Sequence, residues 1–431
     1  MSNRFKYTVV TFSTCLLALL LLGGMLGPTK AAEDAYRHFA VYSEVLSHIK
    51  SSYVEEPDLK SVTLGALNGL LESLDPYASY LNADQYKQYL KSKESRKADV
   101  GLVLSRRFGY VGVVESVPDS PAQKAGLNTG DVLEAIDGIA TRDMPLAYGE
   151  LLLKGEAGSS VKLSVLRFRR GTDAEHITLI RAPIKMPALS STIAQEGVGL
   201  LRIPSFEAGQ TRDIANRLVE LSRQGAEKMV LDLRNNAFTS PEDGIALANL
   251  FVEKGLITYL QGQKYPRKDF EADPARALYK KPVVVLVNRG TAGGAEIAAA
   301  AMLEGKRAEV VGERSYGDAA MRRAISLDDG SAVLLSVAKY HSPSGKAIQD
   351  QAVTPSVSVL TVEPEPESEE EAPAVQAAPQ EDLQLKKAIE VLTRGVAAVR
   401  GDEPGTRAAQ SGFPEPERPI TPLHVPKPPR Q

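Results

Sequence analysis

The sequence contains a single cysteine among its 431 residues, Cys15, which excludes an intramolecular disulfide. The net charge is −3, so no excess of basic residues indicates a nucleic-acid partner. His, Cys and Asp nowhere cluster with the spacing of metal ligands, and the glycine-rich stretch at residues 290–295 lacks the lysine of a phosphate-binding loop. We therefore expect neither a metal nor a cofactor.

The N-terminus carries a targeting pattern. Arg4 and Lys6 precede an uncharged, apolar run at residues 7–29, about the length that spans a bilayer. Residues 1–32 are therefore predicted to be a signal peptide or membrane anchor. An uncleaved anchor in the inner membrane is favoured over cleavage, because Thr29-Lys30-Ala31 is a poor cleavage site. The rest of the chain is then expected in the cell envelope, on the periplasmic side.

Residues 33–97 have a helical pattern. Apolar residues recur at three- and four-residue spacings in its first part, which predicts one apolar helix face. These residues are Phe39, Tyr42, Val45 and Ile49. A second helix is expected from Leu59 to Leu74, where Asp75-Pro76 would end it.

Short β runs and two short helices are predicted in residues 98–184. The stretch SPAQKAGLNTGDVLEAIDG, residues 120–138, resembles the Ser-Pro-Ala…Ala-Gly…Gly-Asp…Ile…Gly series of PDZ domains. In PDZ domains a peptide's C-terminal carboxylate binds backbone amides of the loop before the second strand, and the peptide adds as a further strand beside a helix. The alternative is a PDZ fold that serves only as a spacer.

The PDZ resemblance implies a peptide groove between the loop and strand at residues 100–104 and the helix Pro145–Leu153. Gly101 would let the loop amides turn inward. The implied peptide-binding residues are Val100, Gly101, Leu102, Val103, Leu104, Leu146 and Leu151.

Strands and helices alternate in residues 185–362, which predicts parallel strands joined by crossover helices. The apolar run VVVLV at residues 283–287 is typical of a strand buried on both faces. It leads into the turn Thr291–Ala295 and then a helix. Hydrolases often present a nucleophile at such a strand-to-helix elbow, yet here the turn holds Gly293 and Gly294.

The C-terminal part is rich in Pro, Glu and Ala. Residues 363–381 are interpreted as an acidic linker, and residues 401–431 as a disordered Pro-rich tail. Between them an amphipathic helix is predicted at residues 382–400. Its apolar edge consists of Leu385, Ala388, Ile389 and Leu392.

Several motifs in order resemble the carboxyl-terminal processing proteases, also called tail-specific proteases. The motifs are LDPYASYL at residues 74–81, the PDZ series, MVLDLRNN at 229–236, the elbow run at 283–302, VVGERSYGDA at 310–319 and AKYHSPSGKAIQ at 338–349. The resemblance covers most of the chain, from about Tyr42 to Leu392. It implies a multidomain α+β and α/β fold, with an N-terminal helical region, a PDZ domain and an α/β protease core with a mixed sheet.

The catalytic positions of that family are changed in this chain. Members use a serine nucleophile, a lysine general base and a glutamine that orients the lysine. Counting back from the retained Glu296-Ile297 places Gly293 at the nucleophile position. By the same motifs, the lysine position holds Asp318 and the glutamine position holds Arg322. We expect these two residues to form an ion pair across the vacated site.

The turn expected to form the oxyanion hole is changed as well. In the family, Asp-Leu-Arg-x-Asn is followed by Pro-Gly-Gly, whereas this chain continues with Ala237, Phe238 and Thr239. Residues with side chains disfavour the positive φ values that glycine allows. The donor geometry that stabilises a tetrahedral intermediate is therefore expected to be lost.

These departures favour an inactive peptidase homologue that binds polypeptide C-termini and acts as an adaptor, scaffold or regulator. Expected partners are such tails and an active protease or envelope complex. The alternative is an active serine-type endopeptidase with a non-standard nucleophile. Thr291 and Ser315 are the hydroxyls near the elbow, but neither has a visible lysine or histidine base. A third interpretation is a purely structural envelope component.

Overall fold

The structure is a computed structural model. It describes residue 14 and residues 30–94, 98–107, 109–142, 144–167, 173–195, 197–204, 210–360 and 381–394. The predicted anchor at 7–29, except for residue 14, lies outside the described residues, as do the predicted tail at 401–431 and nearly all of the predicted linker. Among the helices that are described, none is long and apolar enough to cross a membrane.

The chain forms two compact units, residues 1–73 and residues 74–431. In the first unit, helix α2 (Lys30–Ser52) precedes helix α3 (Leu59–Glu72). The Asp58 carboxylate caps α3 by accepting the N–H of Lys60 at 3.0 Å. The helix ends at Glu72 rather than at the predicted Leu74.

The second unit begins with an element that the helical pattern did not predict. Strand β1 (Ser79–Leu81) pairs antiparallel with β16 (Ala332–His341), and helix α4 (Ala83–Glu94) follows it. The predicted helical region is confirmed by α2, α3 and α4, and β1 is an addition that the pattern did not indicate. Three residues are too few to show a β alternation, and the partner strand lies far along the chain.

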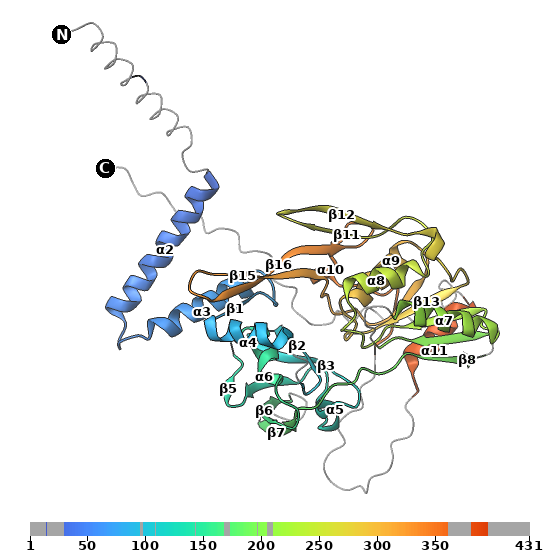
Figure 1. The fold of residues 1–431 in the computed structure, drawn as a ribbon, viewed down its shortest axis with the longest axis horizontal. Coiled ribbons are helices and arrows are strands. Elements are labelled where there is room, and N and C mark those ends of the chain that lie inside the picture. The colour runs from blue at the N-terminus through green and yellow to red at the C-terminus, as the bar shows by residue number, and fades with distance from the viewer. Residues whose placement is uncertain are drawn as a thin grey trace, which may run out of the picture. The chain divides into compact units, whose positions relative to one another are not determined.

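The PDZ domain is an antiparallel sheet in the order β2-β3-β4-β6-β7, with β5 beside β4 (Figure 1). Its strands are β2 (Leu102–Arg107), β3 (Tyr110–Ser116), β4 (Val132–Ile136), β5 (Ile139–Ala140), β6 (Ser160–Leu166) and β7 (Ala174–Ile180). Its helices are α5 (Pro121–Lys124) and α6 (Leu146–Leu153). Strand β7 forms one edge of the sheet and β2 forms the other.

The protease-like core contains the predicted mixed sheet, in the order β17-β14-β13-β10-β9-β8. Only β8 runs antiparallel to its neighbour; the other pairings are parallel. The strands are β8 (Ser190–Gln195), β9 (Val198–Arg202), β10 (Lys228–Asp232), β13 (Val283–Val287), β14 (Glu309–Gly312) and β17 (Val357–Ser358).

Helices cover both faces of this sheet, as the apolar strands predicted. One face packs against α7 (Thr211–Arg223), α8 (Pro241–Asn249) and α9 (Gly294–Glu304). The opposite face packs against α11 (Leu383–Arg394), whose Ala388 and Val391 are buried there. The predicted C-terminal helix is thus part of the core.

A second antiparallel sheet joins β1 and β16 to three further strands (Figure 1). They are β11 (Leu256–Gly262), β12 (Tyr265–Glu271) and β15 (Ala320–Ser326). β15 begins two residues after Asp318 and contains Arg322, so these two predicted site residues lie at and just before the start of this strand.

Arg234 connects the core sheet to α11. Its guanidinium donates to both carboxylate oxygens of Asp232, at 2.9 and 2.8 Å, and to both of Asp382, at 2.9 and 2.7 Å. Asp232 is buried at the end of β10, and Asp382 directly precedes α11. Bidentate pairing of this kind is strong and geometrically specific.

We predict that Arg234→Ala lowers the free energy of unfolding by about 3 kcal/mol, because it removes the bidentate partner of the buried Asp232 carboxylate and leaves it with the more distant Arg202, whose Nε lies 4.0 Å away. Urea unfolding measures this. The matched control is Lys280→Ala, which breaks the exposed Lys280–Glu253 pair at 2.9 Å and should cost under about 1 kcal/mol. Equal losses in the two variants would contradict the prediction.

Candidate functional site

The elbow between β13 and α9 brings the backbone close to the turn after β10. Gly293 precedes α9 with φ of 61° and ψ of −125°, a conformation that glycine adopts at low cost. A Cβ on Gly294 would lie 2.0 Å from the Ser240 carbonyl oxygen. The two glycines therefore allow a backbone contact that larger residues would prevent.

Glu296 holds the elbow against the segment at residues 315–318. Its buried carboxylate accepts the N–H groups of Gly293 at 3.2 Å, Gly317 at 2.7 Å and Asp318 at 2.8 Å. It also accepts the Ser315 hydroxyl. Burial raises the pKa of Glu296 to about 7, although these hydrogen bonds act to lower it. Its bonds are those of a scaffold residue.

The amide best placed to serve an oxyanion is already bonded. In many hydrolases the N–H of the residue after the nucleophile is an oxyanion donor. Here the Gly294 N–H donates to the Thr239 carbonyl at 3.0 Å, and the Ala292 N–H donates to the Asn236 carbonyl at 2.9 Å. The Thr239 hydroxyl, in turn, donates to the Asn236 side chain at 2.5 Å.

The substituted turn does not adopt glycine-like backbone geometry. Ala237, Phe238 and Thr239 all lack a positive φ, which in this stretch occurs only at Asn235, at 54°. Phe238 is half exposed, and Thr239 is buried. A Cβ on Gly293 would lie 3.1 Å from the Thr239 carbonyl oxygen. The turn thus presents a carbonyl, rather than an amide, to the vacated nucleophile position.

Asp318 and Arg322 form the expected ion pair. The guanidinium also lies 3.8 Å from the centre of the Tyr77 ring, a cation–π contact. Burial lowers the pKa of Arg322 but the nearby Asp318 charge raises it, and the net shift is upward. A Cβ on Gly293 would be 3.8 Å from the Asp318 carbonyl oxygen. The three predicted site positions, Gly293, Asp318 and Arg322, are therefore neighbours, with Asp318 next to each of the other two.

The two nearby hydroxyls are buried and engaged. Thr291 donates to the Leu233 carbonyl at 2.9 Å, while Ser315 donates to Glu296 and accepts the Val353 N–H at 2.7 Å. His341 stacks on Tyr259 with ring centres 4.5 Å apart. In the part of the chain that the structure describes, no group of His, Cys, Asp and Glu could hold a metal ion.

The predicted peptide-binding residues of the PDZ domain divide into two groups. Val100, Leu104, Leu146 and Leu151 are buried, and the first three belong to the PDZ core. Leu102 and Val103 are half-buried on the edge strand β2. Gly101 has φ of 83°, and a Cβ there would lie 2.3 Å from the Ser120 Cβ, so the loop requires glycine.

Two carboxylates that the motifs did not single out lie at the PDZ domain. Asp99 Oδ1 accepts the N–H groups of Val100, at 2.6 Å, and of Gly101, at 3.2 Å. In the sequence, the signal for this contact was the acidic residue two positions before the loop glycine. Glu115 in β3 is buried, and its Oε2 has no hydrogen-bond partner.

Glu115 lies at the junction of the PDZ domain and the core. A Cβ on Gly290, next to the elbow, would be 3.2 Å from Glu115 Oε2. Burial raises the pKa of Glu115 to about 8, and the positive charge of Arg202 in the core opposes this shift. The Glu115 carboxyl group therefore lies beside Gly290 of the core, and its burial favours the protonated form.

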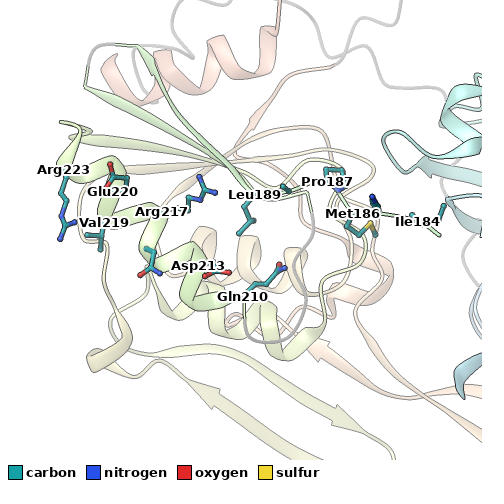
Figure 2. A pocket seen from close by; sticks show the side chains of 13 residues that line it. Ile184, Met186, Pro187, Leu189, Gln210, Asp213, Arg217, Val219, Glu220 and Arg223 are labelled. Carbon is teal, nitrogen blue, oxygen red and sulfur yellow. The ribbon is translucent and has the colours of Figure 1, made fainter. Parts of the chain in front are cut away.

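A large surface pocket lies away from this chemistry. Figure 2 shows it between the segment 184–189 and α7, with a volume of about 1040 Å³. Its charged lining carries both signs, including Asp213, Glu220, Arg217 and Arg223. It contains neither the elbow nor the PDZ loop, so we place the candidate site at those two elements.

Known proteins match the chain in both domains. The model of peptidase family S41 matches residues 197–359, and a PDZ-domain model matches residues 112–167. The carboxy-terminal processing protease CtpA of Bacillus subtilis is 30% identical over 355 residues, which cover 81% of this chain and 75% of that protein. The chain belongs to the carboxyl-terminal processing protease family. The resemblance inferred from the motifs is thus confirmed.

Two further family members support this assignment. The carboxy-terminal-processing protease of Bartonella bacilliformis is 30% identical over 345 residues, 78% of each protein. The solved photosystem II D1 C-terminal processing protease superposes with a TM-score of 0.62 at 27% identity, covering 74% of this chain and 92% of the other. The chain is thus a C-terminal processing peptidase homologue, with a PDZ domain suited to binding C-terminal peptides.

We predict that Glu115→Gln removes a pH-dependent destabilisation. The folded-state pKa of about 8 exceeds the usual value of 4.5, so the folded protein retains a proton that the unfolded chain releases. The wild type should therefore lose stability between pH 4.5 and pH 8, by at most about 1.4 kcal/mol per pH unit, relative to the variant.

Urea unfolding of both proteins at pH 5, pH 6.5 and pH 8 tests this. Glu253→Gln, at an exposed carboxylate, is the control and should follow the wild type. If Glu115→Gln also follows the wild type at every pH, Glu115 is ionised in the folded protein.

Proposed function

We propose that this family member is proteolytically inactive, and that it binds polypeptide C-termini through its PDZ domain as an adaptor, scaffold or regulator. We place it outside the cytoplasm, anchored by residues 7–29. The charged N-terminus and the apolar run support that location. Its partners would be polypeptide tails and an active protease or envelope complex.

The observation that carries the proposal is the chemistry of the elbow. Gly293 has no side chain to form an acyl intermediate, and Asp318, paired with Arg322, occupies the position of the base. Removing the nucleophile of a serine protease costs a factor of about 10⁶ in turnover, roughly 8 kcal/mol of barrier.

The surrounding hydrogen bonds support the same proposal. The Gly294 N–H is bonded to the Thr239 carbonyl, so an oxyanion would have to displace a preformed bond. A donor that must first be released cannot stabilise developing charge without reorganisation. A serine at residue 293 alone would therefore not re-create the site.

The alternative, an endopeptidase with a non-standard nucleophile, has one specific observation in its favour. Ser315 donates to Glu296, a carboxylate with a pKa of about 7. A serine beside a base is the minimum arrangement for nucleophilic catalysis. Both side chains are buried, however, and Ser315 also accepts a backbone N–H. We therefore interpret this pair as structural.

We predict that the full chain leaves an unstructured protein with an apolar C-terminus intact, while an active family member degrades it under the same conditions. Gel electrophoresis over time measures cleavage. The triple variant Gly293→Ser, Asp318→Lys, Arg322→Gln should also remain inactive, because the Thr239 carbonyl still occupies the Gly294 amide.

Adding Ala237→Pro, Phe238→Gly and Thr239→Gly to the triple variant should restore detectable cleavage, because the glycines allow positive φ values with which the carbonyl of residue 239 can turn away from that amide. Ser315→Ala is the matched test of the alternative. Cleavage by the unmodified chain that Ser315→Ala abolishes would overturn the proposal in favour of an active enzyme.

A further inference from the structure

In the loop before β2, the carbonyl groups accept hydrogen bonds from other backbone segments. The amide groups of the same residues both donate to one side chain. The Val100 carbonyl accepts the Ala122 N–H at 3.0 Å, and the Gly101 carbonyl accepts the Val117 N–H at 2.8 Å. The amides of the same two residues both donate to Asp99 Oδ1. The loop therefore directs consecutive N–H groups at a single carboxylate oxygen of this chain.

That arrangement is the one a PDZ domain offers to its ligand. Amides of this loop receive the C-terminal carboxylate of a peptide, which then extends along the edge strand. Here the edge strand is β2, beside helix α6. The Asp99 side chain thus supplies the chemical group that a polypeptide tail would bring.

We infer that Asp99 is an internal competitor for the carboxylate-binding loop, so that a polypeptide tail binds only by displacing its side chain. The inference rests on the proposed function, since it concerns the peptide site of the PDZ domain. It adds a specificity: the displaced Asp99 carboxylate remains tethered beside the loop and repels the negative charge of a tail's carboxylate.

Two consequences follow for the ligand. A tail with a free carboxylate should bind little better than the same tail with an uncharged amide end, because Asp99 cancels the advantage of the charge. Removing Asp99 should restore that advantage. Hydrogen bonds to a charged group correspond to about a 10- to 100-fold change in affinity.

Asp99 can be changed without dismantling the loop. Its backbone pairs with that of Ala182 in both directions, at 3.0 and 2.9 Å, and these bonds do not involve the side chain. Asp99→Gly removes both charge and acceptor. Asp99→Asn removes the charge but keeps an oxygen for the two amides, so it preserves the loop if the glycine variant is destabilised.

The experiment measures fluorescence anisotropy of a labelled decapeptide ending in Leu-Val-Val, as a free acid and as a C-terminal amide, with the full chain. For the wild type we expect the two dissociation constants to agree within about threefold. For Asp99→Gly we expect the free acid to bind about 10-fold or more tightly than the amide, with Asp99→Asn intermediate. Asp173→Asn, an exposed PDZ carboxylate, should behave like the wild type.

The outcomes separate this inference from the function on which it rests. A wild type that already prefers the free acid about 10-fold, with no further gain in either Asp99 variant, overturns the role of Asp99 and leaves peptide binding intact. An equal gain in Asp173→Asn overturns it too, because net charge alone would then explain the effect. Absence of binding in every protein overturns peptide binding by the PDZ domain, and the inference with it.

Discussion

The buried carboxylate of Glu296 is the constraint on which the core around the elbow depends. A charge-bearing group with no exposure is costly unless its oxygens are satisfied, and Glu296 is satisfied by backbone amides from two separate segments. Because these amides belong to Gly293 and to residues 317 and 318, one side chain sets the distance between the start of α9 and the start of β15. Glu296 therefore fixes the shape of the elbow, whichever residues stand at the predicted catalytic positions.

Within that retained shape, the replaced residues satisfy one another. Asp318 and Arg322, at the predicted positions of the base and the orienting residue, form an ion pair, and the Arg322 guanidinium lies against the Tyr77 ring. The Thr239 carbonyl accepts the Gly294 N–H, which would otherwise be available to bind an oxyanion. Catalysis requires donors that are preorganised but unoccupied. In this structure the donors are occupied, because these contacts complete the hydrogen bonding of the resting protein.

The PDZ domain shows a related feature. Two of its own carboxylates lie where it could interact with another group, one at the loop amides and one at the core. Asp99 occupies the loop amides, and Glu115 contacts the core beside Gly290. The first depends on charge, whereas the second is held neutral by burial, with its pKa raised to about 8. The two carboxylates therefore differ in what satisfies them: backbone amides bind that of Asp99, whereas burial favours the protonated form of Glu115.

The sequence by itself determined the family and the order of domains, and its motifs predicted that Gly293, Asp318 and Arg322 stand where the family has Ser, Lys and Gln, because these inferences depend on residue identity within contiguous motifs. The apolar run at β13 likewise predicted a strand covered on both faces. Tertiary structure alone decided the pairing of β1 with β16, the bond from Gly294 to Thr239 and the neutral state of Glu115. Each of these joins segments far apart in the chain, and local patterns carry no record of which distant backbone group will lie within hydrogen-bond distance. Asp99 lies between the two cases: its identity was visible, but only the folded loop shows that both amides point at its carboxylate.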